Sequence, residues 1–125
     1  MKNLFALMVQ IICVSLAQVT MKYASLNLRP LQFKFNTLTK DILIIFSSPW
    51  IICGFSLFTI SSLLWIYLLR LHDLGSLLAF SSFSYIIILL LSHMIFGEII
   101  SFEKFIGMLL IVSGICLVLR ATFPH

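Results

Sequence analysis

The sequence predicts an all-α integral membrane protein: a bundle of four transmembrane helices with a short interfacial amphipathic helix between the first and the second. Of the 125 residues, 62% are hydrophobic and only 10% are charged, and the mean hydropathy is +1.18. A soluble domain of this length has no core large enough for so many apolar side chains. A bilayer is therefore the expected solvent, and helices are expected because isolated strands would leave backbone groups unpaired in lipid.

Four stretches approach the roughly 20 apolar residues that a spanning helix needs. They lie at about 4–21, 50–69, 76–96 and 105–120 and form one integral membrane domain over residues 1–125. The first is expected to end near Lys22, with residues 23–35 as a polar connection punctuated by Arg29-Pro30.

A short amphipathic helix is predicted at about 37–46, capped by Asn36. Leu38, Ile42, Ile45 and Phe46 fall on one of its sides and Lys40 and Asp41 on the other. It is too short to span, so we expect it to lie in the membrane interface.

The later spans have short connections. Ser48-Pro49 reads as the N-cap and first position of the second span, where proline loses nothing. Residues 70–75 join the second and third spans as antiparallel neighbours, and residues 97–104, with Ser101 as a cap, join the third and fourth. Both termini then lie on one side. Five basic residues outside the spans on one side against three on the other weakly favour a cytoplasmic amphipathic helix.

Ser15, Gln18 and Lys22 share one face of the first span, because they follow helical spacing. One interpretation is that Gln18 bonds to neighbouring helices while Lys22 extends to the headgroups. The other is that these side chains line a polar cleft in which Lys22 meets an anionic part of a substrate, such as a phosphate.

Further candidate substrate-binding residues lie on the second and third spans. Ser81, Ser84 and Tyr85 are expected on one face of the third, although close helix packing also accounts for small hydroxyl residues. Trp65 can face the same cleft or anchor the helix at the interface. On the fourth span, Gly107, Ser113 and Gly114 form a stripe of small residues typical of a close helix–helix contact.

All four acidic residues lie outside the spans or at their edges: Asp41, Asp73, Glu98 and Glu103. A carboxylate within the bilayer is the usual proton or cation site, so its absence argues against proton-coupled export. The sequence contains no nucleotide-binding loop, metal-ligand cluster or catalytic arrangement. We therefore expect that the protein is not an enzyme and that it binds no cofactor. The net charge of +4 is spread singly over helix ends, so membrane lipids rather than nucleic acid are the expected partners.

The stretch Phe96-Gly97-Glu98-Ile99-Ile100-Ser101, followed by residues 107–114, resembles the third-to-fourth helix signature of the drug/metabolite transporter superfamily and its four-helix small multidrug resistance branch. Residues 17–24 and 74–85 resemble the end of the first helix and the start of the third in that branch. The resemblance implies a dimer, with the same chain or a similar four-helix subunit, paired through Gly107 and Gly114. It also implies a substrate chamber lined by the first three helices.

In the drug-exporting members a first-helix glutamate binds substrate and protons, and this chain has Val14 at the matching position. A second group, the flippase subunits for aminoarabinose-bearing undecaprenyl phosphate in Gram-negative bacteria, is more similar. It matches in residues 15–18 and 79–85, although Leu78 stands where that group often has tyrosine.

The leading hypothesis is a bacterial inner-membrane transporter or flippase that moves a lipid-linked sugar or similar amphipathic anion as a dimer. A second hypothesis is an exporter of small polar or cationic compounds, for which Glu98 is the one acid near a helix. A third is a non-transporting membrane subunit that scaffolds an envelope-modifying enzyme.

Overall fold

A computed structural model describes residues 3–29 and 35–122, and within these ranges every regular element is a helix. In chain order the helices are α1 (Leu4–Asn27), α2 (Leu38–Ser47), α3 (Pro49–Leu69), α4 (Leu74–Ser81), α5 (Phe83–Phe96) and α6 (Phe102–Thr122). Three helical stretches of the described chain are long and apolar enough to cross a membrane: Leu4–Asn27, Pro49–Leu69 and Leu74–Phe96. The all-α prediction is confirmed, and the chain is a membrane protein.

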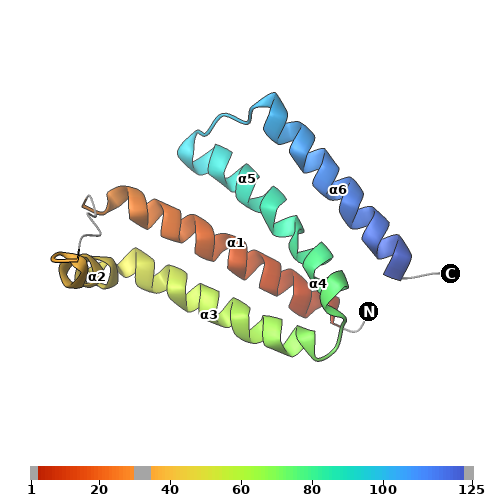
Figure 1. Ribbon diagram of the computed structural model, residues 1–125, viewed down its shortest axis with the longest axis horizontal. Helices are drawn as coiled ribbons and strands as arrows, with labels where there is room; N and C mark the ends of the chain where they lie inside the picture. The colour runs from red at the N-terminus through yellow and green to blue at the C-terminus, as the bar shows by residue number, and fades with distance from the viewer. Residues whose placement is uncertain (1–2, 30–34, 123–125) are drawn as a thin grey trace.

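The long helices lie in a row, with α3, α1, α5 and α6 in that order across the molecule (Figure 1). The most extensive contact is between α1 and α3, α5 packs on the other side of α1, and α6 meets the bundle mainly at α4. The short helix α2 crosses the end at which α1 ends and α3 begins, and both chain ends lie at the opposite end (Figure 1). At the end of the bundle near α2, the part of α1 around Lys22 meets the α5–α6 connection, where Lys22 contacts Glu98.

Small residues allow α1 and α3 to approach closely. Gly54 of α3 lies against α1, where an added Cβ would be 2.7 Å from Met21 Cγ and 3.3 Å from the Ala17 carbonyl oxygen. Further along, the buried Gln10 amide donates to Ser61 Oγ at 3.4 Å, and Ser61 Oγ donates to the Gln10 backbone carbonyl at 3.3 Å. Close packing with polar bonds between helices is how spans associate in lipid.

A cluster of four buried side chains joins α1 to α3 and α4: Leu7, Ile11, Leu68 and Leu77. Trp65, Phe80 and Ile87 pack against it from the sides. Lipid tails are as apolar as these residues, so the cluster stabilises the bundle through close packing rather than through removal from water.

The first helix is longer than predicted, since α1 continues through Asn27 instead of ending near Lys22. Residues 23–27 contain no helix breaker, and Asn27 Nδ2 donates to the Tyr23 carbonyl at 2.9 Å. Ala24 is buried, and the Tyr23 ring meets Trp50 edge to face at a centroid separation of 5.2 Å. Tertiary contacts thus extend the helix; Pro30 and the rest of 30–34 lie outside the described residues.

Asp41 lies on the side of α2 that the rest of the chain covers. Its side chain is only 5% exposed, whereas Leu38, Ile42 and Phe46 are all exposed on the surface of this chain. The carboxylate accepts from Thr37 Oγ1 at 3.3 Å, so a polar partner within the chain holds it inward. The N-cap residue is Thr37, not Asn36 as predicted, and α2 begins one residue later.

The third predicted span is divided at Ser82 into α4 and α5. Ser82 Oγ donates to the Leu78 carbonyl at 3.0 Å and Ser84 Oγ to the Ser81 carbonyl at 2.6 Å. Hydroxyls that bond to the preceding turn compete with the backbone and bend helices, and these two bonds lie at the break. The predicted start of α3, with Ser48 as N-cap and Pro49 at the first position, is confirmed.

Candidate functional site

A polar cluster of three side chains joins α1 to the far end of α5. Lys22 Nζ of α1 forms an ion pair with Glu98 Oε1, and Ser92 Oγ of α5 donates to Glu98 Oε2 at 2.5 Å. Lys22 Nζ also donates to Ser92 Oγ at 3.3 Å. One carboxylate therefore accepts from an ammonium group and a hydroxyl, which is a two-donor site for an oxyanion.

The turn after α5 brings Glu98 to this position. Gly97 has a φ of 63°, in the left-handed region, and its N–H donates to the His93 carbonyl at 3.0 Å. Glycine adopts this conformation without a Cβ penalty, so it ends the helix and reverses the chain. The Glu98 carbonyl lies 2.7 Å from His93 Nδ1. The Gly97-Glu98 pair thus folds the acid back toward α1.

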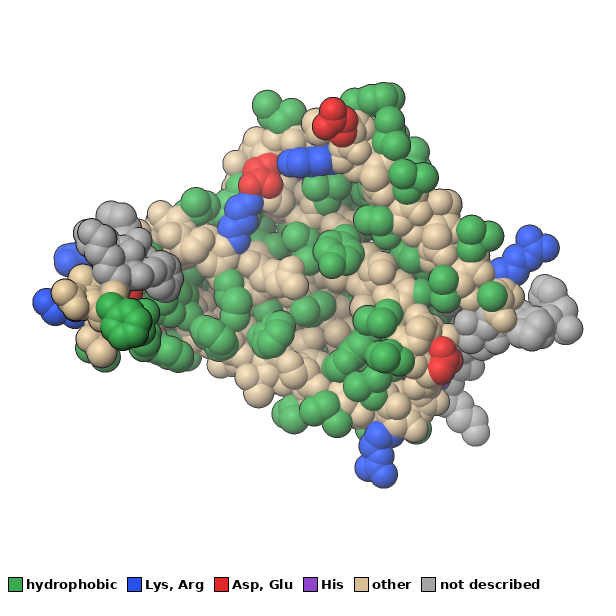
Figure 2. All heavy atoms as spheres, viewed as in Figure 1, with side chains coloured by type: hydrophobic (Ala, Val, Ile, Leu, Met, Phe, Trp, Pro, Cys, Tyr) green, Lys and Arg blue, Asp and Glu red, His purple; other side chains and the backbone are tan. Residues whose placement is uncertain are grey.

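The surroundings favour the charged form of Glu98. The hydrogen bond from Lys22, followed by that from Ser92, holds the pKa of this carboxyl below its ordinary value of 4.5, with a smaller contribution from the charge of Lys104. Lys22 Nζ also lies 4.8 Å from the centre of the Phe96 ring, within the range of a cation–π contact. Acidic and basic side chains adjoin each other over the α5–α6 connection, whereas apolar side chains dominate the face between the ends (Figure 2).

The three residues predicted to share one face of α1 lie in different environments. Ser15 is fully buried and its hydroxyl donates to the Ile11 carbonyl at 2.7 Å, so this group bonds within its own helix. Gln18 is exposed on the chain, and Lys22 lies half-buried in the cluster with Glu98. Of these three residues, Lys22 alone belongs to the cluster.

The candidates on α3, α4 and α5 also lie at different places. Trp65 packs against the apolar cluster of α1, α3 and α4, and Ser84 is buried. Tyr85 is 64% exposed and lines a cavity of about 330 Å³ beside Gly107 and Met108 of α6. Ser81 Oγ is buried without a hydrogen-bond partner among the described residues. Within one copy of the chain, the structure does not gather these residues into one chamber.

Sequence reasoning left three polar residues out of the substrate-binding set. Ser92 and Glu98 complete the cluster around Lys22, and Gln10 forms the buried contact with Ser61. From the sequence Glu98 entered only as the acid near a helix that a cation exporter needs; its place after a helix-ending glycine is the feature that turns it toward Lys22. Gln10 lies one turn or less from Leu7 and Ile11 and carries a buried Oε1 that has no partner in the described part of the chain.

Helix α6 is the least covered of the long helices. Among its described side chains only Ile115 is buried, at 4% exposure. An added Cβ at Gly107 or Gly114 would meet no atom within 4 Å, and Ser113 Oγ donates to the Leu110 carbonyl at 2.8 Å. The small residues predicted for a dimer contact are therefore not used in packing within the chain.

The described residues contain no group of three or more His, Cys, Asp or Glu side chains that could hold a metal ion. What the cluster offers is anion recognition: a fixed cation and a hydroxyl facing one carboxylate at the end of a span. An anionic oxygen of another molecule can make the same two contacts if it replaces Glu98.

Comparisons with protein-family models, curated proteins and solved structures find no match to this chain. The geometry around Lys22 therefore carries the functional argument.

Proposed function

We propose that this chain is a transporter or flippase subunit of the bacterial inner membrane, with the four-helix architecture of the small multidrug resistance branch. Its substrate is an amphipathic anion, such as a lipid-linked sugar phosphate. The observation that carries this proposal is the oxyanion site at the end of α1, where Lys22 and Ser92 both donate to the Glu98 carboxylate.

In the proposed mechanism, a substrate phosphate exchanges with the Glu98 carboxylate on Lys22. Both groups are oxyanions, so the ammonium group and the hydroxyl can donate to either one without rearrangement. While Glu98 is bound, Lys22 is neutralised, which lowers the cost of holding a cation at the membrane boundary. Glu98 thus competes with the substrate and keeps the empty site closed.

A second candidate, export of a cationic compound, is favoured by the position of Glu98 against α1. The lowered pKa of this carboxyl argues against it. A group that exchanges protons for substrate works best with a pKa near the ambient pH, whereas Glu98 stays ionised at neutral pH. Anion exchange needs no proton, so collapse of the proton gradient leaves the proposed activity intact.

The dimer and the fourth span belong to the same proposal. Helix α6 has 21 residues, with Glu103 and Lys104 in its first turns and Arg120 in its last. Its length suffices to cross a bilayer. Pairing of two copies through Gly107 and Gly114 would fill the space beside these residues and cover a helix that the chain itself leaves bare.

The test uses two substitutions with opposite expected signs, assayed in vesicles that contain the purified protein and a fluorescent lipid-linked anion. Lys22→Gln removes the cation and is expected to lower the initial transport rate at least tenfold. Glu98→Gln removes the competing carboxylate and is expected to lower the substrate concentration needed for half-maximal rate. Lys104→Gln, which removes a nearby cation outside the ion pair, is the matched control and leaves both quantities near those of the parent.

Loss of transport in Glu98→Gln, with a fluorescent cation as the better substrate, would replace anion transport by cation export. No transport by any form, together with co-purification of a large enzyme, would instead indicate the scaffold subunit.

A further inference from the structure

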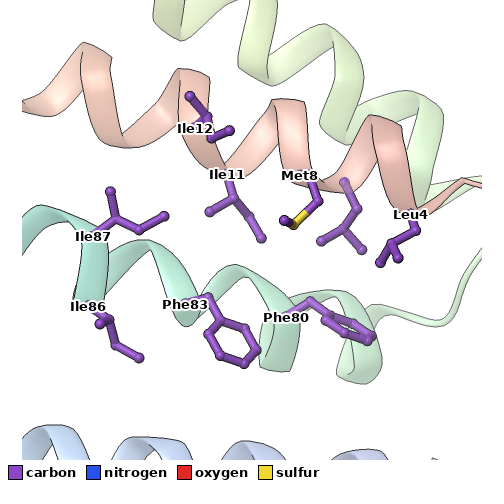
Figure 3. A pocket seen from close by; sticks show the side chains of 9 residues that line it. Leu4, Met8, Ile11, Ile12, Phe80, Phe83, Ile86 and Ile87 are labelled. Carbon is purple, nitrogen blue, oxygen red and sulfur yellow. The ribbon is translucent and has the colours of Figure 1, made fainter.

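The two halves of α5 carry different side chains. Near the beginning of the helix, Ile87 lines an apolar groove together with Ile11 of α1 (Figure 3). Near its end lie two polar residues, the buried Ser92 and the exposed His93. Ser92 belongs to the anion site, where it donates to the Glu98 carboxylate, whereas the His93 ring contacts the Glu98 backbone. The two neighbours thus contact the same residue at different groups.

We propose that His93 is a positioning residue of the anion site: its ring N–H holds the Glu98 backbone, and thereby the carboxylate, in place against Lys22. This inference rests on the proposed function and adds its regulation, because the hold on Glu98 sets how strongly that carboxylate competes with a substrate anion. His93 Nδ1 lies 2.7 Å from the Glu98 carbonyl oxygen. A carbonyl oxygen only accepts hydrogen bonds, so Nδ1 carries the hydrogen.

Two bonds to His93 fix the turn that carries Glu98. The Gly97 N–H donates to the His93 carbonyl at 3.0 Å, and the His93 ring donates to the Glu98 carbonyl. Two consecutive residues of the connection are therefore tied to one residue in the last turn of α5. Lys104 also reaches the connection, but its Nζ lies 3.5 Å from the Ile99 carbonyl oxygen, which is longer than usual for a hydrogen bond. The His93 bond is the shorter and stronger of these two side-chain contacts.

Glu98 is the member of the cluster that no helix holds. Lys22 and Ser92 lie within α1 and α5, which pack against each other, whereas Glu98 lies in the connection between α5 and α6. A residue in a free connection loses backbone and side-chain freedom when it forms an ion pair, and this loss weakens the pair. A hydrogen bond that already fixes the Glu98 backbone leaves less freedom to lose. Removal of the His93 donor should therefore weaken the Lys22–Glu98 contact while the two donors to the anion stay in place.

The test is zero-length cross-linking of the full chain in phosphatidylcholine vesicles. A water-soluble carbodiimide joins an amine to a carboxylate that it contacts, and the reagent can reach both groups because the Lys22 and Glu98 side chains are 39% and 40% exposed. The yield of the Lys22–Glu98 link is measured by mass spectrometry. His93→Leu is expected to lower this yield about fivefold, the factor that corresponds to loss of one hydrogen bond.

Two further variants separate the donor from a general effect of substitution. His93→Asn keeps an N–H donor near the position of Nδ1 and is expected to keep most of the yield. His72→Leu is the matched control, because it changes a histidine in the α3–α4 connection at the opposite end of the bundle, and it should leave the yield unchanged (Figure 1). A measurement that needs no variant is nitrogen NMR of the histidine-labelled parent at mildly alkaline pH, where neutral His93 should carry its hydrogen on Nδ1.

Equal cross-linking yields for the parent and His93→Leu would overturn the proposal, as would a hydrogen on Nε2 alone in the parent. In the vesicle transport assay, His93→Leu should lower the substrate concentration for half-maximal rate about fivefold and leave the maximal rate unchanged. In a Glu98→Gln background it should change neither, because the carboxylate that it positions is gone; an equal effect in both backgrounds would also overturn the proposal. Cross-linking that depends on His93 in a protein that transports no lipid-linked anion would uphold the positioning contact and refute the proposed function.

Discussion

Gly54 is the position at which a single added carbon tests the α1–α3 packing most directly. In Gly54→Ala the new Cβ would lie 2.7 Å from Met21 Cγ and 3.3 Å from the Ala17 carbonyl oxygen. The first distance is well inside van der Waals contact, so either Met21 changes rotamer or the two helices separate. Neither response is free, because α1 and α3 form the largest contact of the bundle.

The expected magnitude combines two opposing effects. Overpacking of a well-packed contact costs about 1–3 kcal/mol. Replacement of a helical glycine by alanine returns about 1 kcal/mol through helix propensity. Gly54→Ala should therefore lower the free energy of unfolding by about 1 kcal/mol net. Gly107→Ala, where the Cβ meets nothing within 4 Å, should raise it by about the same amount.

The assay is unfolding by sodium dodecyl sulfate in mixed micelles, followed by circular dichroism at protein concentrations low enough to keep the chain monomeric. The double variant Gly54→Ala with Met21→Ala removes the clashing Cγ and should recover about 1 kcal/mol relative to the two single changes added together. Equal stabilities for Gly54→Ala and Gly107→Ala, or no coupling with Met21, would refute the close approach of these helices.

Two further predictions concern the charged residues at the helix ends. Because the pKa of Glu98 in the folded chain lies below 4.5, its contribution to stability is present above that pH and is lost as the pH falls through the lowered value. The unfolding midpoints of the parent and of Glu98→Gln should therefore converge as the pH falls through that range. Midpoints that stay the same distance apart at every pH would contradict the ion pair. Asp73 is the N-cap of α4 and accepts from the Ser76 N–H at 2.9 Å. Asp73→Ala should therefore lower the free energy of unfolding by about 1 kcal/mol, whereas Asp73→Asn, an equally good cap, should lower it little. Identical decreases for the two variants in the same unfolding assay would show that the cap is not responsible.

The three long apolar helical stretches were predictable, because length and apolar composition are what a span requires. Pro49 at the start of α3 follows from a local rule, and the structure has it there. The continuation of α1 beyond Lys22 was not predictable in this way, because it depends on contacts such as Tyr23 with Trp50, which are distant in sequence. Asp41 illustrates the same limit: helical spacing places it on one side of α2, but the fold decides which side is covered.

Of the three residues in the candidate site, only Lys22 was predicted from the sequence as a substrate-binding residue. Lys22 could be found because a lysine in an apolar helix is conspicuous in the sequence. Its partners could not, since Ser92 lies 70 residues away and Glu98 is 76 residues away. Packing of α5 against α1 places Ser92 there, and the reversal of the chain at Gly97 brings Glu98; a positive φ at one glycine has no periodic signature.

The Lys22–Glu98 ion pair affects how the absence of a carboxylate from the centre of α1 is interpreted. Val14 leaves the centre of α1 without a carboxylate, yet the fold returns one to the end of the same helix from the α5–α6 connection. Lys22 and Glu98 together carry no net charge. When a singly charged phosphate replaces Glu98 on Lys22, the ammonium group stays paired and the released carboxylate stays ionised on the α5–α6 connection, so the exchange itself requires no group to gain or lose a proton. The arrangement that argues against drug–proton antiport thus also supplies the physical reason why proposed anion transport can run without a proton gradient.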